Sequence, residues 1–404
     1  MPPTSIGPRA TSRNRSLRPA TSAGFDVGHV LWTFLPRSET FIATQLAAQR
    51  ELSQIVLCLR RENVDSHTFV PVASPSLSRS VAVLSAAYDA AAALSGFPLS
   101  YDRWLRRTVR GRRPRLLHAH FGWAGTSALL AANDARLPLI TAFHGLDVYT
   151  PSLSPAHWRR SYPQLFADGT LFTCVGPGAM AQLTSIGCPP SRLRVVPVGL
   201  DLDHFPFAPR ELSSSPSIIQ VGRMIPKKGF DLTVRAFSSV QRELPGAHLS
   251  LVGDGPERPA LERLVREYDL DRHVKFFGAL PPQRVRELVK ESHVGIQPSR
   301  TAPDGDREGS PTVLLEFQAA GLDVVATRHT DIPWIVANAT SLVDENDVEA
   351  LATALLTACT ATQSVRSARL AAGRALVDHR HDATKIAGLL RDLYNEAMDC
   401  ASSR

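Results

Sequence analysis

Short apolar segments alternate with segments of helical periodicity along most of the chain. In the first half, apolar runs of strand length fall near 27–34, 54–59, 116–119, 138–142, 170–175 and 193–197. In the second half they fall near 217–221, 248–252, 274–277, 294–297 and 324–326. Helical spacing of apolar residues fills the gaps, as in 39–50, 124–135, 230–243, 256–268, 282–291 and 348–359. This alternation predicts an α/β fold with parallel sheets.

The alternation breaks at 197–209, a proline-containing segment that fits neither a strand nor a helix. It predicts two doubly wound, Rossmann-like domains on either side of a linker. Ligands bind outside the carboxyl ends of the strands in such sheets, so two facing domains would bind theirs in a cleft. The expected divisions are a domain at 25–198, a linker at 199–216, a domain at 217–375 and a C-terminal helix at 376–404 that packs back on the first domain.

Composition favours a soluble globular protein. The chain has 404 residues, of which 44% are hydrophobic and 21% are charged, and its net charge is +7. No apolar run reaches the roughly 20 residues that a membrane-spanning helix needs. The five cysteines are scattered without a CxxC pair, which favours reduced thiols and a cytoplasmic location. Residues 1–24 carry four arginines and no acid, and we expect them to form a disordered basic tail.

The segment Glu308–Glu316 combines a loop with the start of a helix. Ser310 is a suitable N-cap, and Pro311 would then occupy the first helical position. The free amides of the first turn, up to that of Leu314, would form an anion site. Glu316 follows in an apolar run without a cation three or four residues away, which is costly for a carboxylate unless a ligand donates to it. A ligand with a phosphate and hydroxyl groups would satisfy both features.

A basic turn follows the strand expected at 217–221. Arg223 and Lys228 stand at this strand end beside Gly222, and two fixed cations there would suit a diphosphate. An ordinary solvated turn is the alternative. The next strand ends in a glycine-rich turn around Asp254, which lacks the spacing of a dinucleotide fingerprint and is interpreted as a tight strand-to-helix turn. The absence of that fingerprint after the first strand argues against an NAD-dependent enzyme.

Three histidines follow strands in the first half of the chain, at His118, His120 and His144. No cysteine or carboxylate cluster accompanies them, so a metal site is not expected. His144 precedes a glycine and is interpreted as a cleft residue, whereas structural roles are equally open for the other two. Ser38 or Thr40 can cap the helix expected at 39–50 or face a phosphate across the cleft.

Seven arginines and no acid lie within 103–115, with apolar residues between them. This run suits the anionic inner face of a membrane or an acidic acceptor, and a solvated helix face is an equally open alternative. Nucleic acid is not expected as a partner, because no binding motif accompanies the run. Asp304 and Asp306 are expected to lie in a mobile acidic loop rather than to bind a metal.

Taken together, these segments resemble the retaining GT-B glycosyltransferases of the group 1 and family 4 type, which use nucleotide sugars. The resemblance covers about residues 25–375 and rests on motifs in the family's order. These are Gly222-Arg223 with Lys228-Gly229, Gly253–Pro256, Phe277-Gly278, Pro298-Ser299 and Glu308–Glu316. The segments 36–41, 118–122 and 143–147 resemble a subgroup of bacterial exopolysaccharide glycosyltransferases of the colanic-acid type. The family often has proline at the position of Asp323.

The resemblance implies a role for each candidate residue. Catalytic roles fall to His144, Glu308, Arg223 and Lys228, with the two cations on the donor diphosphate and His144 facing the reacting sugar. Glu316 would accept from the ribose hydroxyls. Further donor contacts would come from Gly222, Asp254, Phe277, Gly278, Leu280, Gly309, Ser310, Pro311, Thr312 and Val313. Contacts to the acceptor or a phosphate would come from Ser38, Thr40, His120 and Asp147.

The implied function is transfer of a sugar, with retention, from a nucleotide sugar to a hydroxyl acceptor. UDP is the favoured nucleotide, and neither a metal nor a cofactor is expected. The acceptor would be a saccharide or a lipid-linked molecule in exopolysaccharide or glycolipid synthesis. A small molecule of secondary metabolism, such as an aminocyclitol, is an alternative. An alternative of another class is a nucleotide-sugar-binding protein without catalysis.

Overall fold

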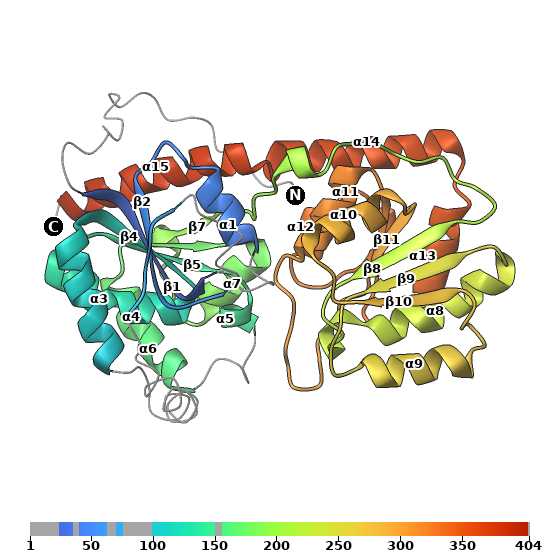
Figure 1. Ribbon diagram of the computed structural model, residues 1–404, viewed down its shortest axis with the longest axis horizontal. Coiled ribbons are helices and arrows are strands. Elements are labelled where there is room, and N and C mark those ends of the chain that lie inside the picture. Colours follow the sequence, from blue (N-terminus) through green and yellow to red (C-terminus); the bar gives the residue numbers. More distant parts are fainter. Residues whose placement is uncertain (1–23, 35–39, 63–69, 76–98, 150–155, 403–404) are drawn as a thin grey trace.

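The computed structural model describes residues 24–34, 40–62, 70–75, 99–149 and 156–402, arranged in two α/β domains (Figure 1). The first domain contains a seven-stranded sheet with the order β3-β2-β1-β4-β5-β6-β7. The second contains a six-stranded sheet with the order β10-β9-β8-β11-β12-β13. All neighbouring strands are parallel. The prediction of two doubly wound α/β domains is confirmed.

In the first domain the strands are apolar runs because helices cover both faces of the sheet, and every residue of β5 and β6 is buried. The strands are β1 (Phe25–Phe34), β2 (Gln54–Arg61), β3 (Val72–Ala73), β4 (Pro114–His120), β5 (Leu139–Phe143), β6 (Leu171–Cys174) and β7 (Leu193–Val195). The helices are α1 (Thr40–Ala47), α3 (Leu99–Arg112), α4 (Gly122–Ala135), α5 (Leu146–Tyr149), α6 (Ala156–Asp168) and α7 (Pro177–Ser185).

The second domain repeats this plan. Its strands are β8 (Ser217–Val221), β9 (His248–Val252), β10 (Val274–Gly278), β11 (Val294–Gln297), β12 (Asp323–Thr327) and β13 (Leu342–Val343). Its helices are α8 (Phe230–Glu243), α9 (Arg258–Glu267), α10 (Pro282–Lys290), α11 (Thr312–Ala320), α12 (Ile332–Ile335) and α13 (Val348–Cys359). The edge strands β3 and β13 are absent from the sequence prediction, because two residues are too few to show a periodicity.

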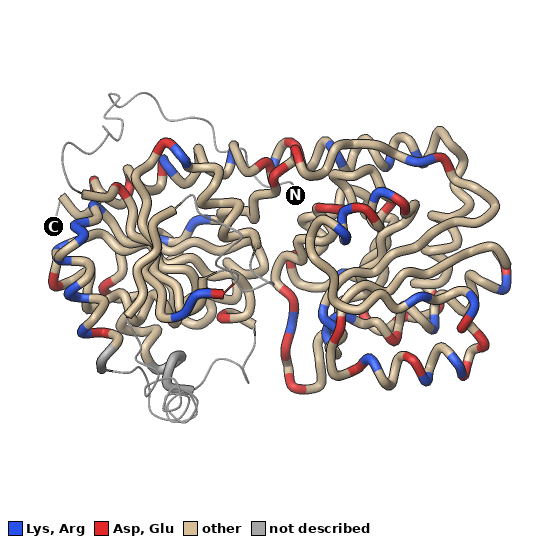
Figure 2. The backbone as a smooth tube through the Cα atoms, in the orientation of Figure 1, with Lys and Arg blue, Asp and Glu red and all other residues tan. Residues whose placement is uncertain are grey.

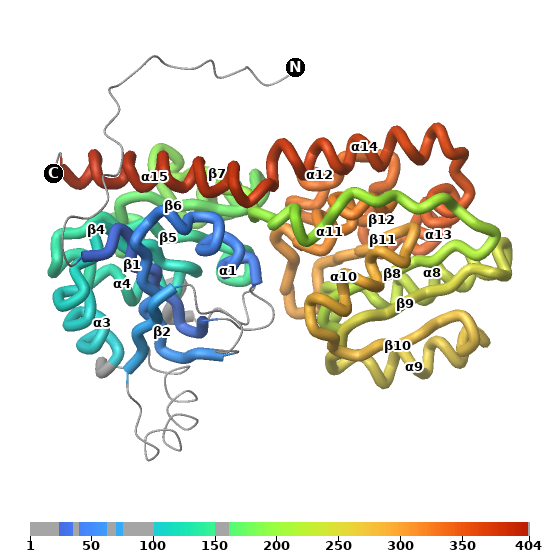
Figure 3. Tube along the Cα trace, turned by 45° about the horizontal axis from the view of Figure 1, so that its top comes forward, coloured from blue at the N-terminus to red at the C-terminus, as the bar shows by residue number. Residues whose placement is uncertain are grey.

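The chain crosses between the domains twice, and the two crossings are hydrogen-bonded to each other. The Leu200 amide donates to the His381 carbonyl (2.7 Å), and the Leu200 carbonyl accepts from the Ala383 amide (3.0 Å). Helix α14 (Gln363–Arg380) packs on α11, whereas α15 (Ala383–Ser402) runs back along the first domain (Figures 1 and 3). Leu390 of α15 packs with Ile140 of the first sheet.

None of the helices in the described part of the chain has the length and apolar character needed to span a bilayer.

The domains touch where the loop after β5 meets the loop before α11. A Cβ atom added at Gly145 would lie 3.1 Å from the Cα atom of Gly309, closer than ordinary van der Waals contact, so the two backbones approach tightly here. Nearby, the Asp331 carboxylate of the second domain accepts hydrogen bonds from the amides of Gly178 (2.6 Å) and Ala179 (3.2 Å) in the first turn of α7. These contacts hold the carboxyl ends of the two sheets opposite each other.

Candidate functional site

A cleft of about 910 Å³ lies between the domains. Its size is within the range of small-molecule sites in proteins. Loops at the carboxyl ends of β5, β8 and β9 contribute to its wall, as expected for doubly wound sheets. Most of the candidate residues meet there. Those that line the cleft are Thr40, His144, Gly222, Arg223, Lys228, Asp254, Leu280, Glu308, Gly309, Ser310, Pro311, Thr312, Val313 and Glu316.

Two lysines and two acids form an ion-pair cluster at one wall of the cleft. Lys228 Nζ lies 3.1 Å from Glu308 Oε2, and Lys227 Nζ lies 2.9 Å from Asp306 Oδ1 and 3.7 Å from Glu308 Oε1. Burial alone would raise the pKa of Glu308, but the Lys228 and Lys227 ammonium groups outweigh that effect and lower the pKa. Glu308 is therefore ionised at neutral pH. The expectation of a mobile acidic loop is wrong for Asp306, which is 9% exposed and fixed by Lys227.

The start of α11 differs in detail from the expectation. The helix begins at Thr312, and its N-cap residue is Pro311, whose backbone is extended. Ser310 is not the cap: its hydroxyl is buried and has no hydrogen-bond partner among the described residues. The amide of Leu314 donates to the Pro311 carbonyl (3.1 Å), so it is not free for an anion. The first turn still borders the cleft through Thr312 and Val313.

Glu316 borders the cleft one turn further along α11. Burial raises the pKa of this carboxyl to about 7, and the positive charge of Arg286 offsets part of the effect. Arg286 belongs to α10 rather than to the same helix, so the sequence spacing around Glu316 does not show it. Glu316 thus titrates near neutrality and would gain from any ligand that donates hydrogen bonds to it.

Of the three residues predicted to hold the nucleotide base, only one lines the cleft. Leu280 lines the cleft, but Phe277 and Gly278 do not. The Gly278 carbonyl accepts from the Gly253 amide (2.8 Å), and the Phe277 ring lies under Lys275 Nζ at 4.7 Å. These two residues therefore shape the strand end behind the cleft. Their predicted contact with the base stays a prediction.

His144 is the predicted histidine that reaches the cleft from the first domain. His120 and Asp147 lie behind it and are 0% and 3% exposed, so the expectation of direct acceptor or phosphate contacts is wrong in this structure. The Asp147 carboxylate instead accepts from the amides of Gly122 (2.8 Å), His144 (2.9 Å) and Gly145 (3.1 Å). Burial raises the pKa of Asp147 to about 6, and these amides limit the rise.

The candidates at the start of α1 are only partly described. Thr40 is the first residue of α1 and borders the cleft. Ser38 lies outside the described residues. The predicted contact of this helix start with a phosphate therefore stays a prediction.

Two family models cover most of the chain in sequence. Residues 48–204 match the model described as Glycosyltransferase Family 4, and residues 203–371 match the one described as Glycosyl transferases group 1. The chain belongs to this glycosyltransferase family. The two matched segments contain cleft residues of both domains. His144 lies in the first segment, and Arg223, Glu308 and Glu316 lie in the second.

Curated relatives carry names from polysaccharide and glycolipid synthesis. The putative colanic acid biosynthesis glycosyltransferase WcaL of Salmonella typhimurium is 33% identical over 59% of this chain and 59% of the relative. The amylovoran biosynthesis glycosyltransferase AmsK of Erwinia amylovora is 31% identical over the same shares. A GDP-mannose-dependent phosphatidylinositol monomannoside mannosyltransferase of Mycobacterium tuberculosis is 33% identical over 61% of this chain and 69% of the relative. The chain thus spans about three fifths of the length of the first two relatives.

Solved structures confirm the GT-B fold. The crystal structure of Anabaena HepE in complex with UDP has a TM-score of 0.74 and 17% identity, over 92% of this chain and 100% of that chain. WaaG, a glycosyltransferase involved in lipopolysaccharide biosynthesis, has a TM-score of 0.61 and 18% identity, over 91% and 99% of the two chains. At this level of identity the likeness concerns the fold alone.

Sequence reasoning missed three residues of this glycosyltransferase that support the cleft or the contact between the domains. Lys227 looks like a second surface lysine beside Lys228, yet it is 5% exposed. Asp331 contacts amides that lie 152 and 153 residues away in the chain. His29 has a weak signal, because it is a polar residue inside the apolar strand β1.

Proposed function

We propose that this chain transfers a sugar from a nucleotide sugar to a hydroxyl acceptor, with retention of configuration. The observation that carries the proposal is the arrangement of one cleft wall. Arg223, Lys228 and the first turn of α11 border the same space, and Glu316 lies one helical turn beyond. Cations and helix amides suit a diphosphate, and a carboxylate with a raised pKa suits the ribose hydroxyls.

The chemistry follows from these charges. Departure of a nucleoside diphosphate develops negative charge, which fixed cations stabilise when they are held in place before the reaction. Glu308 holds Lys228 at 3.1 Å and so restricts the ammonium group to the cleft wall. We propose that this arrangement works without a metal. The acceptor would attack from the face that the diphosphate leaves, and the donor phosphate would take the acceptor proton.

UDP is the proposed nucleotide, and GDP is the alternative. A solved structure of the same fold is described as a complex with UDP, whereas a relative is named as GDP-mannose-dependent. The proposed acceptor is a saccharide or lipid-linked molecule of exopolysaccharide or glycolipid synthesis, in line with the relatives' names. A small-molecule acceptor of secondary metabolism is the alternative.

Turnover and binding of UDP-, GDP-, ADP- and dTDP-sugars test the proposal. Wild type is compared with Glu316→Ala and Lys228→Ala, and with Lys290→Ala and Glu291→Ala as charge-matched controls at the exposed end of α10. We expect one donor to be turned over, with loss of turnover in the two cleft variants alone. Binding without turnover in the presence of mixed acceptors would favour a non-catalytic binding protein. No binding of any donor would overturn the assignment.

Contact with a membrane surface is proposed for α3. Its arginines at 103, 106, 107, 110 and 112 are exposed, and Figure 2 shows basic segments along this helix. Arg106 pairs with Asp134, and Arg110 lies 3.5 Å from the same carboxylate, so part of this charge is neutralised. We predict that the protein sediments with anionic liposomes at low salt and that Arg103→Glu with Arg107→Glu reduces this. Equal sedimentation with neutral liposomes, or none at all, would contradict membrane contact.

A further inference from the structure

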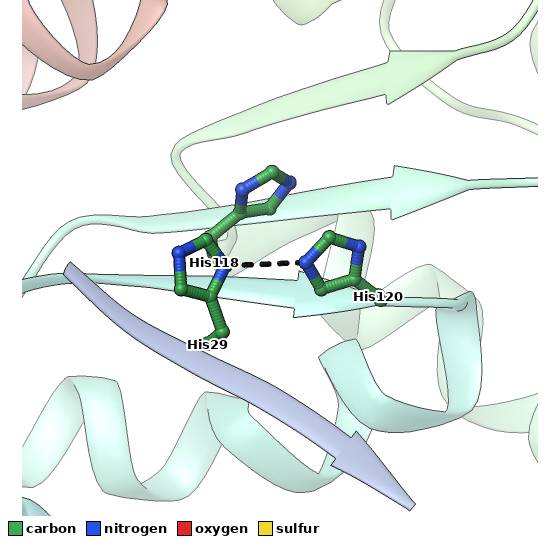
Figure 4. Close-up of side chains that lie close together, drawn as sticks. All are labelled: His29, His118 and His120. Carbon is green, nitrogen blue, oxygen red and sulfur yellow. Dashed lines mark hydrogen bonds between the residues drawn. The ribbon is translucent and has the colours of Figure 1, made fainter. Parts of the chain in front are cut away.

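A chain of four hydrogen-bonded side chains leads from the core of the first domain to the cleft. Gln54 Oε1 lies 3.1 Å from His29 Nε2, His29 Nδ1 lies 3.2 Å from His120 Nε2, and His120 Nδ1 lies 3.3 Å from His144 Nε2. Gln54, His29 and His120 are buried, and His144 borders the cleft. Figure 4 shows the central contact between His29 and His120. These residues come from β2, β1, β4 and the loop after β5.

The side-chain amide of Gln54 determines which group donates and which accepts in each hydrogen bond of this side-chain series. Its Nε2 donates to two backbone carbonyls, those of Leu46 (3.1 Å) and Gln49 (2.8 Å). A carbonyl can only accept, so the orientation of the amide is determined and its Oε1 must face His29 as an acceptor. His29 therefore carries its hydrogen on Nε2, which leaves Nδ1 as a bare acceptor.

The same argument passes along the next two rings. A neutral imidazole has one donor nitrogen and one acceptor nitrogen. Because His29 Nδ1 accepts, His120 must donate from Nε2 and accept at Nδ1, and His144 must then donate from its Nε2. Burial favours the neutral ring at each step: it lowers the pKa of His29 and of His144 to about 3 and that of His120 well below the ordinary value.

We propose that Gln54, His29 and His120 are positioning residues that hold His144 as a neutral ring whose only N–H is used inside the protein. His144 then contacts the bound sugar as an uncharged acceptor and supplies no proton to the departing diphosphate. Its Nδ1 is buried in the unliganded protein and has no hydrogen-bond partner among the described residues, so this nitrogen is the one left to accept from a ligand hydroxyl that reaches it. The inference rests on the proposed function, since it assigns the state of one residue in that cleft.

A metal ion is the competing explanation for the buried histidines. One nitrogen from each of His29, His118 and His120 lies within 4.8 Å of the others. However, the His118 and His120 rings are stacked, with centroids 4.5 Å apart and planes at 26°. Lone pairs lie in the ring plane, so those of stacked rings run side by side and do not converge on one ion. The His118 ring lies beside the contact between the other two (Figure 4), and its Nδ1 is hydrogen-bonded to the Tyr394 hydroxyl (2.9 Å).

Nitrogen-15 NMR of the whole protein with labelled histidine tests the inference, because the two neutral tautomers, the cation and a metal-bound ring give different signals. The His144 signal is assigned from its loss in His144→Gln. We expect His144 in the Nε2–H form, and conversion towards the Nδ1–H form in His29→Phe and in Gln54→Leu. A cationic or Nδ1–H ring in wild type would overturn the proposal, and so would stoichiometric zinc that resists a chelator.

Kinetics supply the second readout. We expect kcat to fall about tenfold in His29→Phe and Gln54→Leu, the effect of one misplaced hydrogen bond, while the KM for the donor stays unchanged. Tyr394→Phe is the matched control, because it removes a buried hydrogen bond from the same cluster outside the chain of four. An equal loss of kcat in this control would show a merely structural effect. If wild type binds no nucleotide sugar, the proposed function fails, but the NMR result still decides the state of His144.

Discussion

Burial of Glu316 opposes ionisation of its carboxyl group, and this makes ligand binding depend on pH. Its pKa is raised from 4.5 to about 7 in the unliganded protein. Ribose hydroxyls that donate to the carboxylate would favour the charged form and lower that pKa. Nucleotide binding is then linked to proton release, and affinity rises with pH up to about 7.

We therefore predict that nucleoside diphosphate binds more tightly at pH 7.5 than at pH 6, by at most about eightfold, because affinity stops rising near the pKa of the free carboxyl. Titration calorimetry in buffers of different ionisation enthalpy would show release of a fraction of a proton near pH 7. Glu316→Gln should bind more weakly and lose the proton release. Equal proton release in wild type and variant would exclude Glu316.

The stability of the free protein has the opposite pH dependence at this site. Because folding raises the pKa of Glu316, its contribution to the free energy of unfolding falls as the pH rises from 4.5 to 7.

Among the elements, β12 illustrates how a residue that departs from the family pattern is accommodated. Asp323 begins this strand at a position where the family usually has proline. It is 2% exposed, and its carboxylate lies 3.0 Å from Arg369 of α14. Burial raises the pKa of Asp323, and Arg369 limits the rise. The ion pair thus ties the start of the strand to α14.

Removal of Arg369 is predicted to be costly because it leaves a buried carboxylate without its partner. Arg369→Ala should lower the free energy of unfolding by about 3 kcal/mol at pH 7.5. The loss should be smaller at pH 5, because burial raises the pKa of Asp323 and protonation as the pH falls relieves the unpaired charge. Urea denaturation at the two pH values measures this. The double variant Arg369→Ala with Asp323→Asn should recover stability at pH 7.5, and a loss that is independent of pH would contradict this account.

At the scale of the whole molecule, one carboxylate links the two domains. Asp331 accepts from the Gly178 and Ala179 amides, and so it caps α7 of the opposite domain. A Cβ at Gly176 would lie 2.5 Å from the Asp331 carboxyl carbon, so the close approach requires glycine there. The relative position of the domains is therefore coupled to the stability of a helix end.

We predict that Asp331→Ala lowers the free energy of unfolding by about 1 kcal/mol and also opens the cleft. Asp347→Ala is the control, because Asp347 caps α13 within its own domain through the Ala350 amide (2.9 Å). Urea denaturation should show a similar loss in both variants. Small-angle scattering without nucleotide should show a larger radius of gyration for Asp331→Ala alone. An unchanged radius in both would mean that this contact does not hold the domains together.

The amino-acid sequence determined the features that depend on neighbours in the chain. Apolar periodicity predicts the two parallel sheets, because burial of a strand or helix face requires apolar residues at regular spacing. Glycines and cations at strand ends locate the cleft residues, since the carboxyl ends of parallel strands meet at one edge. Most of the residues expected in the cleft, from Gly222 to Glu316 and with His144 opposite, do line it.

The tertiary structure alone decided which groups are paired, buried or exposed. Lys227 meets Asp306, Arg286 acts on Glu316, and Asp331 caps a helix in the other domain. His120 and Asp147, for which the resemblance implies acceptor or phosphate contacts, lie buried behind His144. The physical reason is distance along the chain: hydrogen bonds, desolvation and charge act between groups that folding brings within a few ångströms, and no local pattern records that approach.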